Sequence, residues 1–307
     1  MGPVTVAVLA AAVRAGTPVL FGTLGEIIAE RAGILNLGVE GMMLVGALAG
    51  FIVTSRTGNP WAGAAAAGAV GGGLSLIHAF LSITLRANQV ASGLALTIFG
   101  TGLSAFLGKG YVGVPAAGFQ PAALPFLDRI PVLGPALFQQ DALVYLSYVI
   151  VPTAWYVLYR TRWGLEIRAV GERPEAADAM GIDVARTRYA CVAVGGILAG
   201  LGGTFLSTAY TSMWIENMTA GRGWIAVALV IFATWDPLRA VAGAYLFGGV
   251  NALQLHIQAT GTTLPTYLLL MTPYLFTIAV LVVATQETAR KRLGAPAALS
   301  VPYSRSG

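Results

Sequence analysis

The sequence predicts an all-α polytopic membrane protein. Of its 307 residues, 56% are hydrophobic and only 10% are charged, and the mean hydropathy is +0.75. Soluble domains carry about 25% charged residues, so the charge content argues against a soluble globular domain. Apolar runs of about 20 residues, the length needed to cross a bilayer, recur along the chain. The charges gather in one segment, residues 160–188, which holds six Arg and five acidic residues.

We expect about nine transmembrane helices, within a range of eight to ten. The approximate spans are 5–28, 36–54, 61–84, 90–108, 141–159, 189–209, 218–235, 240–258 and 266–286. Residues 109–140 are rich in Pro and Gly and predict an external loop. Arg14 falls inside the first span, where a charge at mid-bilayer is costly. The stretch Gly16-Thr17-Pro18 could therefore break this span and leave a separate first element.

The distribution of Lys and Arg predicts the orientation, because cytoplasmic loops carry the excess of basic residues. If the segment 160–188 is cytoplasmic, thirteen basic residues lie inside and four outside. The N-terminus is then external. We expect residues 1–290 to form a single transmembrane domain, with 160–188 as its main cytoplasmic loop, and residues 291–307 to form a disordered cytoplasmic tail.

Small residues are frequent, and two pairs have the spacing that brings transmembrane helices close together. These are Gly46 with Gly50 and Gly196 with Gly200. Helix packing and the general abundance of Gly explain them equally well. The single Cys191 excludes an internal disulfide. The net charge of +5 comes from Arg at expected span ends, without the basic stripe of a nucleic-acid-binding protein.

The charged segment contains the signals of a short helix. Pro174 suits the first helical position, Glu175 and Asp178 place negative charge near the N-terminal end, and Gly181 suits the residue after the last turn. A helix of about two turns is marginal alone in water, so it requires a surface to pack against. An apolar patch of Ala176, Ala177 and Met180 favours docking to a partner over an ordinary solvated loop.

The chain carries no recognisable catalytic or nucleotide-binding motif. It has no H-E-x-x-H motif, no paired cysteines and no spacing typical of metal ligands. The sequence of residues 102–109 partly matches the motif of a phosphate-binding loop. Its glycines are too far apart, however, and Gly110 follows Lys109 where Ser or Thr is needed. We therefore expect neither an enzyme nor a bound cofactor or metal. Any ATP that drives the protein would be bound by a separate subunit.

Several blocks of sequence resemble the permease subunits of bacterial ABC importers. The first is Gly171-Glu172 followed by Ala176-Ala177, Met180-Gly181-Ile182, Arg186 and the small-residue run 195–203, which is similar to their cytoplasmic coupling loop. Residues 24–43, 87–95 and 219–226 look like the branched-chain amino acid/ribose/nucleoside superfamily. The length resembles the shorter guanosine-type or simple-sugar permease subunit.

The resemblance implies a transmembrane permease subunit that moves nucleosides or simple sugars by alternating access. It implies three partners in a bacterial or archaeal cytoplasmic membrane: an ABC ATP-binding subunit, a second and paralogous permease, and an extracytoplasmic substrate-binding lipoprotein. The residues expected to couple to the ATPase are Gly171, Glu172, Glu175, Ala176, Ala177, Asp178, Met180 and Gly181.

Polar residues near the expected spans are candidates for the substrate pathway, since intramembrane polar groups are usually functional. They are Asn36, Glu40, Asn88, Gln89, Ser92, Asn217 and Thr219. Asn, Gln and Ser exchange hydrogen bonds with neutral, hydroxyl-rich solutes. Asn36 and Glu40, four residues apart, are expected on one helix face. Helix capping is the alternative role for Asn36, Asn88 and Thr219.

Gly interrupts segments in both halves of the chain, at 33–41 and 218–223, as in transporters built from broken helices. Two other classes of protein remain open. One is an ion-driven secondary transporter with Glu26 or Glu40 as the ion site, which would not need a docking helix. The other is a membrane enzyme, for which no catalytic set is present.

Overall fold

The computed structural model describes residues 3–261, 265–284 and 294–304 and has an all-α architecture. Seven of its helices are long and apolar enough to cross a membrane, and two further apolar helices are shorter. In the described residues, strands are limited to the two-residue β1 (Ala122–Ala123) and β2 (Gln139–Gln140). The all-α polytopic fold is confirmed. Among the described residues, seven of the nine expected transmembrane helices are long enough to span, and the two expected at 218–235 and 266–286 correspond to the shorter apolar helices.

The α-helices are α1 (Pro3–Arg31), α2 (Val39–Thr57), α3 (Pro60–Ala79), α4 (Gln89–Gly108), α5 (Leu133–Leu137), α6 (Ala142–Arg160), α7 (Arg162–Glu172), α8 (Pro174–Ala179), α9 (Val184–Phe205), α10 (Arg222–Phe232), α11 (Pro237–Ala259) and α12 (Thr266–Ala284). Two π-helical turns extend α3 and α9: η1 (Phe80–Thr84) and η4 (Leu206–Tyr210). Two 3₁₀ turns, η2 (Lys109–Tyr111) and η3 (Leu127–Arg129), lie in the loop between α4 and α5.

Local capping explains where many of these helices begin. An Asn or Asp side chain accepts hydrogen bonds from the free backbone N–H groups at the start of a helix. The N-cap residues of α3, α4, α6, α9 and α11 are Asn59, Asn88, Asp141, Asp183 and Asp236. Proline follows at the first position of α3 and α11, where its missing N–H costs nothing.

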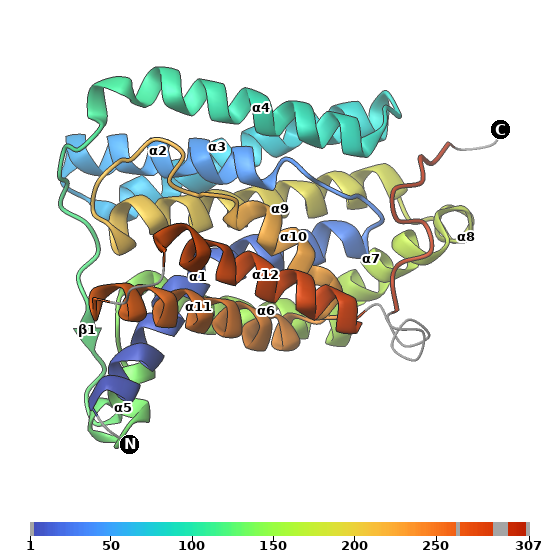
Figure 1. The fold of residues 1–307 in the computed structure, drawn as a ribbon. Helices are drawn as coiled ribbons and strands as arrows, with labels where there is room; N and C mark the ends of the chain where they lie inside the picture. The colour runs from blue at the N-terminus through green and yellow to red at the C-terminus, as the bar shows by residue number, and fades with distance from the viewer. Residues whose placement is uncertain (1–2, 262–264, 285–293, 305–307) are drawn as a thin grey trace.

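The long helices run side by side, and the two ends of the bundle differ (Figure 1). The N-terminus, α5 and β1 lie at one end, and α7, α8 and the C-terminal residues lie at the other. Helix α9 runs through the interior and packs against α1, α2 and α3. This arrangement separates the loop 109–140 from the charged segment 160–188 by the length of the bundle.

Glycines make the close contacts of α9 with its neighbours. A Cβ atom on Gly46 of α2 would lie 2.6 Å from the Cα of Gly200. A Cβ on Gly71 of α3 would lie 2.3 Å from the carbonyl oxygen of Gly196. Both distances are shorter than real Cβ contacts, so only glycine permits this separation of the backbones. The Gly pairs identified in the sequence therefore serve helix packing.

Helix α1 is continuous, so the break considered at Gly16-Thr17-Pro18 is absent and the helix contains Pro18. Its 29 residues are about 43 Å long at 1.5 Å per residue, which exceeds the roughly 30 Å hydrocarbon core. Arg14 lies about 25 Å from Arg31 along this helix. Its guanidinium donates a hydrogen bond to the carbonyl of Ala209 at 2.9 Å. If the Arg31 end of α1 lies at one face of the hydrocarbon core, this distance places the Arg14 charge near the opposite face and not at mid-bilayer.

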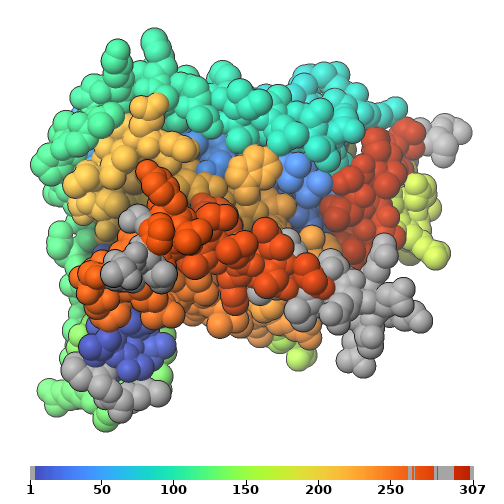
Figure 2. All heavy atoms as spheres, viewed as in Figure 1, coloured from blue at the N-terminus to red at the C-terminus, as the bar shows by residue number. Residues whose placement is uncertain are grey.

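Residues 294–304, here called the C-terminal strap, lie against the same end of the bundle as α7 and α8. They belong to the tail 291–307 that we expected to be disordered, of which residues 291–293 and 305–307 lie outside the described residues. The backbone N–H of Ala298 donates to the carbonyl of Gly171 at 2.9 Å, and that of Ser300 donates to the carbonyl of Gly33 at 3.2 Å. Figure 2 shows the strap, in red, next to the yellow-green segment of α8. Ala298 is buried, and Leu299 packs against the main apolar core. Paired backbone groups and buried apolar side chains hold this segment in place.

Candidate functional site

Two breaks in the helical structure bring the polar residues of the interior together. Residues 32–38 separate α1 from α2, and residues 211–221 separate η4 from α10. The sequence predicted a full span at 218–235, but α10 has 11 residues and is about 16 Å long. It begins after Ala220 and Gly221, which have φ values of +46° and +81°. This left-handed backbone ends any helical continuation, so α10 is too short to cross the bilayer alone.

Glu40, in the first turn of α2, joins the two breaks. Its Oε1 accepts hydrogen bonds from the Thr219 hydroxyl at 2.5 Å and from the Gly221 N–H at 2.8 Å. Its Oε2 accepts one from the Gly223 N–H at 2.6 Å. The carboxylate therefore occupies the N-terminal end of α10, where free N–H groups and the helix dipole favour negative charge.

The contact between α2 and α10 is close enough to require glycine. A Cβ atom on Gly223 would lie 2.5 Å from the Cα of Glu40. Glu40 and Thr219 are both buried. The contact lies deep in the bundle, because the neighbouring Ala226 of α10 accepts a hydrogen bond from Thr23, which lies eight residues before the end of α1. Three hydrogen-bond donors stabilise the Glu40 carboxylate at this depth, because they replace the water that it loses on burial.

Side chains from neighbouring helices also satisfy the backbone of the first break. The Leu35 N–H donates to Gln89 Oε1 at 2.8 Å, and the Leu35 carbonyl lies 3.1 Å from Nε2 of His78. Ser92 Oγ lies 3.0 Å from the other ring nitrogen of His78, and Thr97 Oγ1 donates to the Leu37 carbonyl at 2.8 Å. A non-helical backbone inside a membrane is stable only when such partners replace water.

Asn36 has a local role that the sequence did not predict. The helix begins at Val39, so Asn36 and Glu40 do not share a helix face as expected from their spacing. The Asn36 side-chain oxygen accepts a hydrogen bond from the Gly38 N–H at 2.9 Å and stabilises the turn. Its side chain is buried. The Gly-rich sequence around it terminates the helical pattern, which is why the four-residue spacing misleads.

Two buried glutamates of α1 contact the first break and the turn after α10. Glu26 Oε2 accepts a hydrogen bond from the Asn36 N–H at 3.3 Å. Glu30 Oε2 accepts one from the indole N–H of Trp235, in the turn after α10, at 2.6 Å. The i, i+4 spacing puts both carboxyls on one face. The sequence suggested Glu26 only as a possible ion site, and nothing in it linked Glu30 to Trp235.

The remaining two candidates of the substrate pathway lie away from this cluster. Asn88 is exposed and caps α4 by accepting a hydrogen bond from the Ala91 N–H at 2.9 Å. Asn217 is exposed in a turn, with a φ of +54°. The interior cluster therefore contains Asn36, Glu40, Gln89, Ser92 and Thr219, together with His78, Thr97 and Glu26. In the part of the chain that the structure describes, no group of three or more His, Cys, Asp or Glu could hold a metal ion.

The short helix of the charged segment has the form that its end residues predict. Helix α8 begins at Pro174 and ends before Met180. Gly181 has a φ of +84°, its N–H donates to the Asp178 carbonyl, and the Ile182 N–H donates to the Ala177 carbonyl. These two bonds form the Schellman motif, in which glycine closes a helix.

Helix α8 divides its expected docking residues between two faces. Glu172, Glu175, Ala176 and Gly181 are exposed, and the Met180 side chain is 82% exposed. Asp178 is half-buried. Ala177 is buried against Val170 and Val184, so its expected place on the outward patch is incorrect. The six-residue helix needs one face to attach to its own protein, and only the opposite face is open to a partner.

Gly171 connects this docking region to the end of α1. A Cβ atom at Gly171 would lie 2.1 Å from the carbonyl oxygen of Arg31. Arg188, at the start of α9, donates from Nε to the Ala32 carbonyl at 3.1 Å and is almost completely buried. Next to α8, a groove of about 460 Å³ opens between η1, the start of α9 and Tyr303 of the strap. Helix α8, the strap and the first break thus form one continuous region.

Comparisons with known proteins cover nearly the whole chain. A family model described as branched-chain amino acid transport system / permease component matches residues 8–285. The putative glucose ABC transporter permease protein TsgC13 of Haloferax volcanii is 48% identical over 97% of this chain and 97% of its own. The guanosine ABC transporter permease protein NupQ of Bacillus subtilis is 34% identical over 93% of this chain and 92% of its own. The glucose ABC transporter permease protein TsgB13 of Haloferax volcanii is 25% identical over 75% of this chain and 64% of its own. No solved structure matches.

Proposed function

Because the chain belongs to the permease family of the branched-chain amino acid transport system, we propose that it carries a neutral, hydroxyl-rich solute, either a nucleoside or a simple sugar. The chain is a permease subunit of an ABC importer in a bacterial or archaeal cell membrane, and a separate subunit hydrolyses ATP. The relatives named for guanosine and for glucose support this solute class. Both solutes present vicinal hydroxyl groups and carry no charge.

The observation that carries the mechanism is the contact of Glu40 with the N-terminus of α10. Two helices that begin inside the bundle meet through three hydrogen bonds to one carboxylate. Broken helices of this kind supply hinges and binding groups near the bilayer midplane of transporters. We infer that the interior cluster lines or supports the solute pathway. Alternating access then requires that α10 and α2 take two arrangements, which ATP-driven contacts stabilise unequally.

The open face of α8 is the proposed contact with the ATPase. Met180 has a large apolar side chain that is mostly exposed, with the carboxylates of Glu172 and Glu175 nearby on the same loop. Movement of α8 would reach the first break through two contacts: Gly171 touches the carbonyl of Arg31, and Arg188 binds the carbonyl of Ala32. This connection links the docking surface to the segment that holds Asn36.

The remaining partners follow from the family and its relatives. ABC importers combine permeases with an ATPase and a substrate-binding protein, and we propose an extracytoplasmic lipoprotein for the latter. We propose a paralogous second permease, because Haloferax volcanii has two related glucose permease proteins, TsgC13 and TsgB13. In this proposal residues 1–290 form one permease domain, with 160–188 as the coupling loop and 109–140 as the external loop.

Uptake into proteoliposomes tests the energy source. The full transporter is reconstituted, and uptake of guanosine and of D-glucose is measured with internal and external ATP and with imposed proton or sodium gradients. Uptake that requires ATP on the side of α8 supports the proposal. Uptake that persists without ATP and collapses with the ion gradient contradicts it, and would indicate a secondary transporter that uses Glu26 or Glu40.

A pair of substitutions tests the docking face. Met180→Arg places a charge on the open face of α8, and Ile215→Arg makes the same change at an apolar side chain, 44% exposed, in the segment after η4 at the opposite end of the bundle. We expect Met180→Arg to lower co-purification of the ATPase and ATP-driven uptake at least tenfold, while Ile215→Arg leaves both unchanged. Equal co-purification and uptake in the two variants would remove Met180 from the interface.

A further inference from the structure

A pocket of about 540 Å³ lies at the external end of the bundle, away from the interior cluster. It is bounded by the first turns of α1, by α5 and β2, and by the end of η4. Residues that line it include Val6, Ala7, Ala10, Arg14, Gln140 and Tyr210. Its volume is within the range of about 300–1,000 Å³ that small-molecule sites have. Arg14 lies about 25 Å from the cytoplasmic end of α1, so the pocket is near the outer membrane surface.

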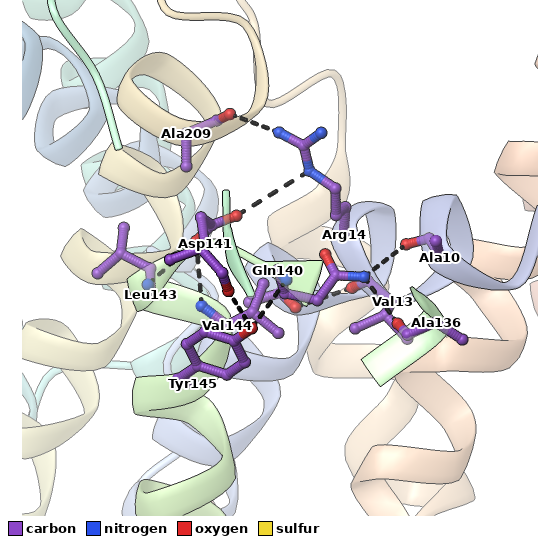
Figure 3. A network of polar contacts seen from close by, with 12 residues as sticks. Ala10, Val13, Arg14, Ala136, Gln140, Asp141, Leu143, Val144, Tyr145 and Ala209 are labelled. Carbon is purple, nitrogen blue, oxygen red and sulfur yellow. Dashed lines mark hydrogen bonds and ion pairs between the residues drawn. The ribbon is translucent and has the colours of Figure 1, made fainter. Parts of the chain in front are cut away.

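Arg14, one of the residues that line this pocket, faces the fully buried Asp141 (Figure 3). Arg14 Nη2 donates to the Ala209 carbonyl at 2.9 Å, while its Nε lies 4.0 Å from Asp141 Oδ2. That distance allows charge attraction but is too long for a hydrogen bond. Among the described residues, neither Arg14 Nε nor Asp141 Oδ2 has a hydrogen-bond partner. The Arg14 side chain is 33% exposed, but its Nε is buried, so a solute can reach only the other parts of this side chain.

Asp141 is held in place by its capping role. Its Oδ1 accepts hydrogen bonds from the Leu143 and Val144 N–H groups at 3.0 and 3.1 Å. Burial raises the pKa of this carboxyl, while the Val144 N–H and the Arg14 charge oppose the rise. The opposite charges of Arg14 and the buried Asp141 offset each other beside the pocket.

Gln140 supplies a fixed acceptor next to this pair. Its Nε2 donates to the carbonyls of Ala136 and Ala10 at 2.7 and 3.3 Å, and these bonds fix the orientation of the amide. The Oε1 points away from both carbonyls (Figure 3) and has no donor among the described residues. The side chain is 1% exposed. A buried acceptor without a donor is unfavourable, so a solute that donates here gains a ready partner.

The other walls of the pocket suit the faces of a sugar ring. The small side chains of Val6, Ala7 and Ala10 form an apolar surface on α1, and the aromatic side chain of Tyr210 lines the pocket from η4. A pyranose or ribose has apolar C–H faces and hydroxyl groups at its edge. Donors from Arg14 and an acceptor from Gln140 match hydroxyls, which both donate and accept.

We propose that this external pocket is a receiving site for the transported solute, which binds vicinal hydroxyls of a pyranose or ribose ring before the solute enters the membrane. The identity of the solute class rests on the proposed function. The site itself rests on Arg14, Gln140 and the volume beside them. It is separate from the cluster around Glu40, since one lies at the outer surface and the other deep in the bundle.

Two tryptophan substitutions on one helix test the pocket. Ala7→Trp fills it, and the matched Leu9→Trp alters a neighbouring exposed residue that does not line it. Equilibrium binding of [³H]guanosine and of D-[¹⁴C]glucose is measured on the assembled, nucleotide-free transporter in nanodiscs without the substrate-binding lipoprotein. We expect Ala7→Trp to raise the Kd at least tenfold for one of the two probes and Leu9→Trp to leave it unchanged. The probe that binds identifies the ring type.

Equal Kd values for the two variants, or absence of binding of both probes to the unmodified transporter, would overturn the proposal. If Ala7→Trp lowers the yield of the assembled complex, Arg14→Lys replaces it. That change keeps the charge beside Asp141 but removes the forked N–H donors of the guanidinium. It should raise the Kd at least threefold, whereas an unchanged Kd overturns the proposal. The measurement needs no ATP, so a failure of ATP-dependent uptake would refute the proposed function without affecting this result.

Discussion

Replacing Glu40 with Gln tests the contact on which the proposed mechanism depends. Glu40→Gln keeps the shape of the side chain but leaves one oxygen in place of two. The carboxylate accepts bonds from Thr219, Gly221 and Gly223. If the remaining oxygen keeps the two bonds of Oε1, the new amide N–H₂ group faces the N–H of Gly223, and two donors oppose each other.

The expected cost follows from the bond that is lost. A hydrogen bond to a charged group contributes about 1.5–3 kcal/mol, and an unsatisfied buried donor costs a similar amount. The loss of the Gly223 bond should therefore lower the free energy of unfolding by about 1.5–3 kcal/mol. This corresponds to a roughly 10- to 150-fold change in the unfolding equilibrium constant.

Unfolding in mixed dodecyl maltoside and SDS micelles measures this change. Glu216→Gln is the control, because Glu216 is an exposed carboxylate in the segment that precedes α10. The reconstituted Glu40→Gln transporter should also show a lower maximal uptake rate with normal binding of the ATPase, since the affected contact is distant from α8. If Glu40→Gln and Glu216→Gln unfold with the same free energy, the carboxylate does not hold the start of α10 and the reasoning fails.

Two further predictions concern packing and the strap. Gly71→Ala should lower the free energy of unfolding by about 1–3 kcal/mol, because the new methyl group would meet the Gly196 carbonyl. The control Gly73→Ala has open space around it and should be neutral or stabilising in the same micelle unfolding assay. Equal effects of the two substitutions would refute the packing argument. Ala298→Arg inserts a charge at a buried site, so it should expose the strap and raise the amide hydrogen exchange of the strap several-fold, as measured by mass spectrometry. The control Val301→Arg changes a side chain that is 52% exposed and should not raise the exchange. Unchanged exchange in both variants would show that the strap is held elsewhere.

Local signals predicted the parts of the structure that depend on neighbours in the sequence. Pro174 and Gly181 delimit α8 because a missing N–H and a positive φ have the same meaning in any fold. The apolar spans were also predictable, since the bilayer sets their length. The break at Gly221 could be suspected from its Gly-Arg-Gly context, but the length of α10 could not.

Long-range contacts account for what the sequence left open. Thr219 and Gly223 bind Glu40 across about 180 residues, and no local pattern specifies that pairing. The same limit applies to Ala177, whose helical position is clear from sequence but whose orientation is set by Val170 and Val184. Asn36 was misplaced because a four-residue spacing implies a shared face only inside a helix.

The C-terminal strap has a consequence for the order in which the protein is made. Gly33 and Arg31 are synthesised about 265 residues before Ala298 and Ser300, which cover this region. At 5–20 residues per second, the interval is about 15–50 s. During this time the cytoplasmic end of α1 stays uncovered while the other spans insert. Closure of the strap is therefore a late step of biogenesis, and a chain that stops before residue 294 would remain open at its docking end.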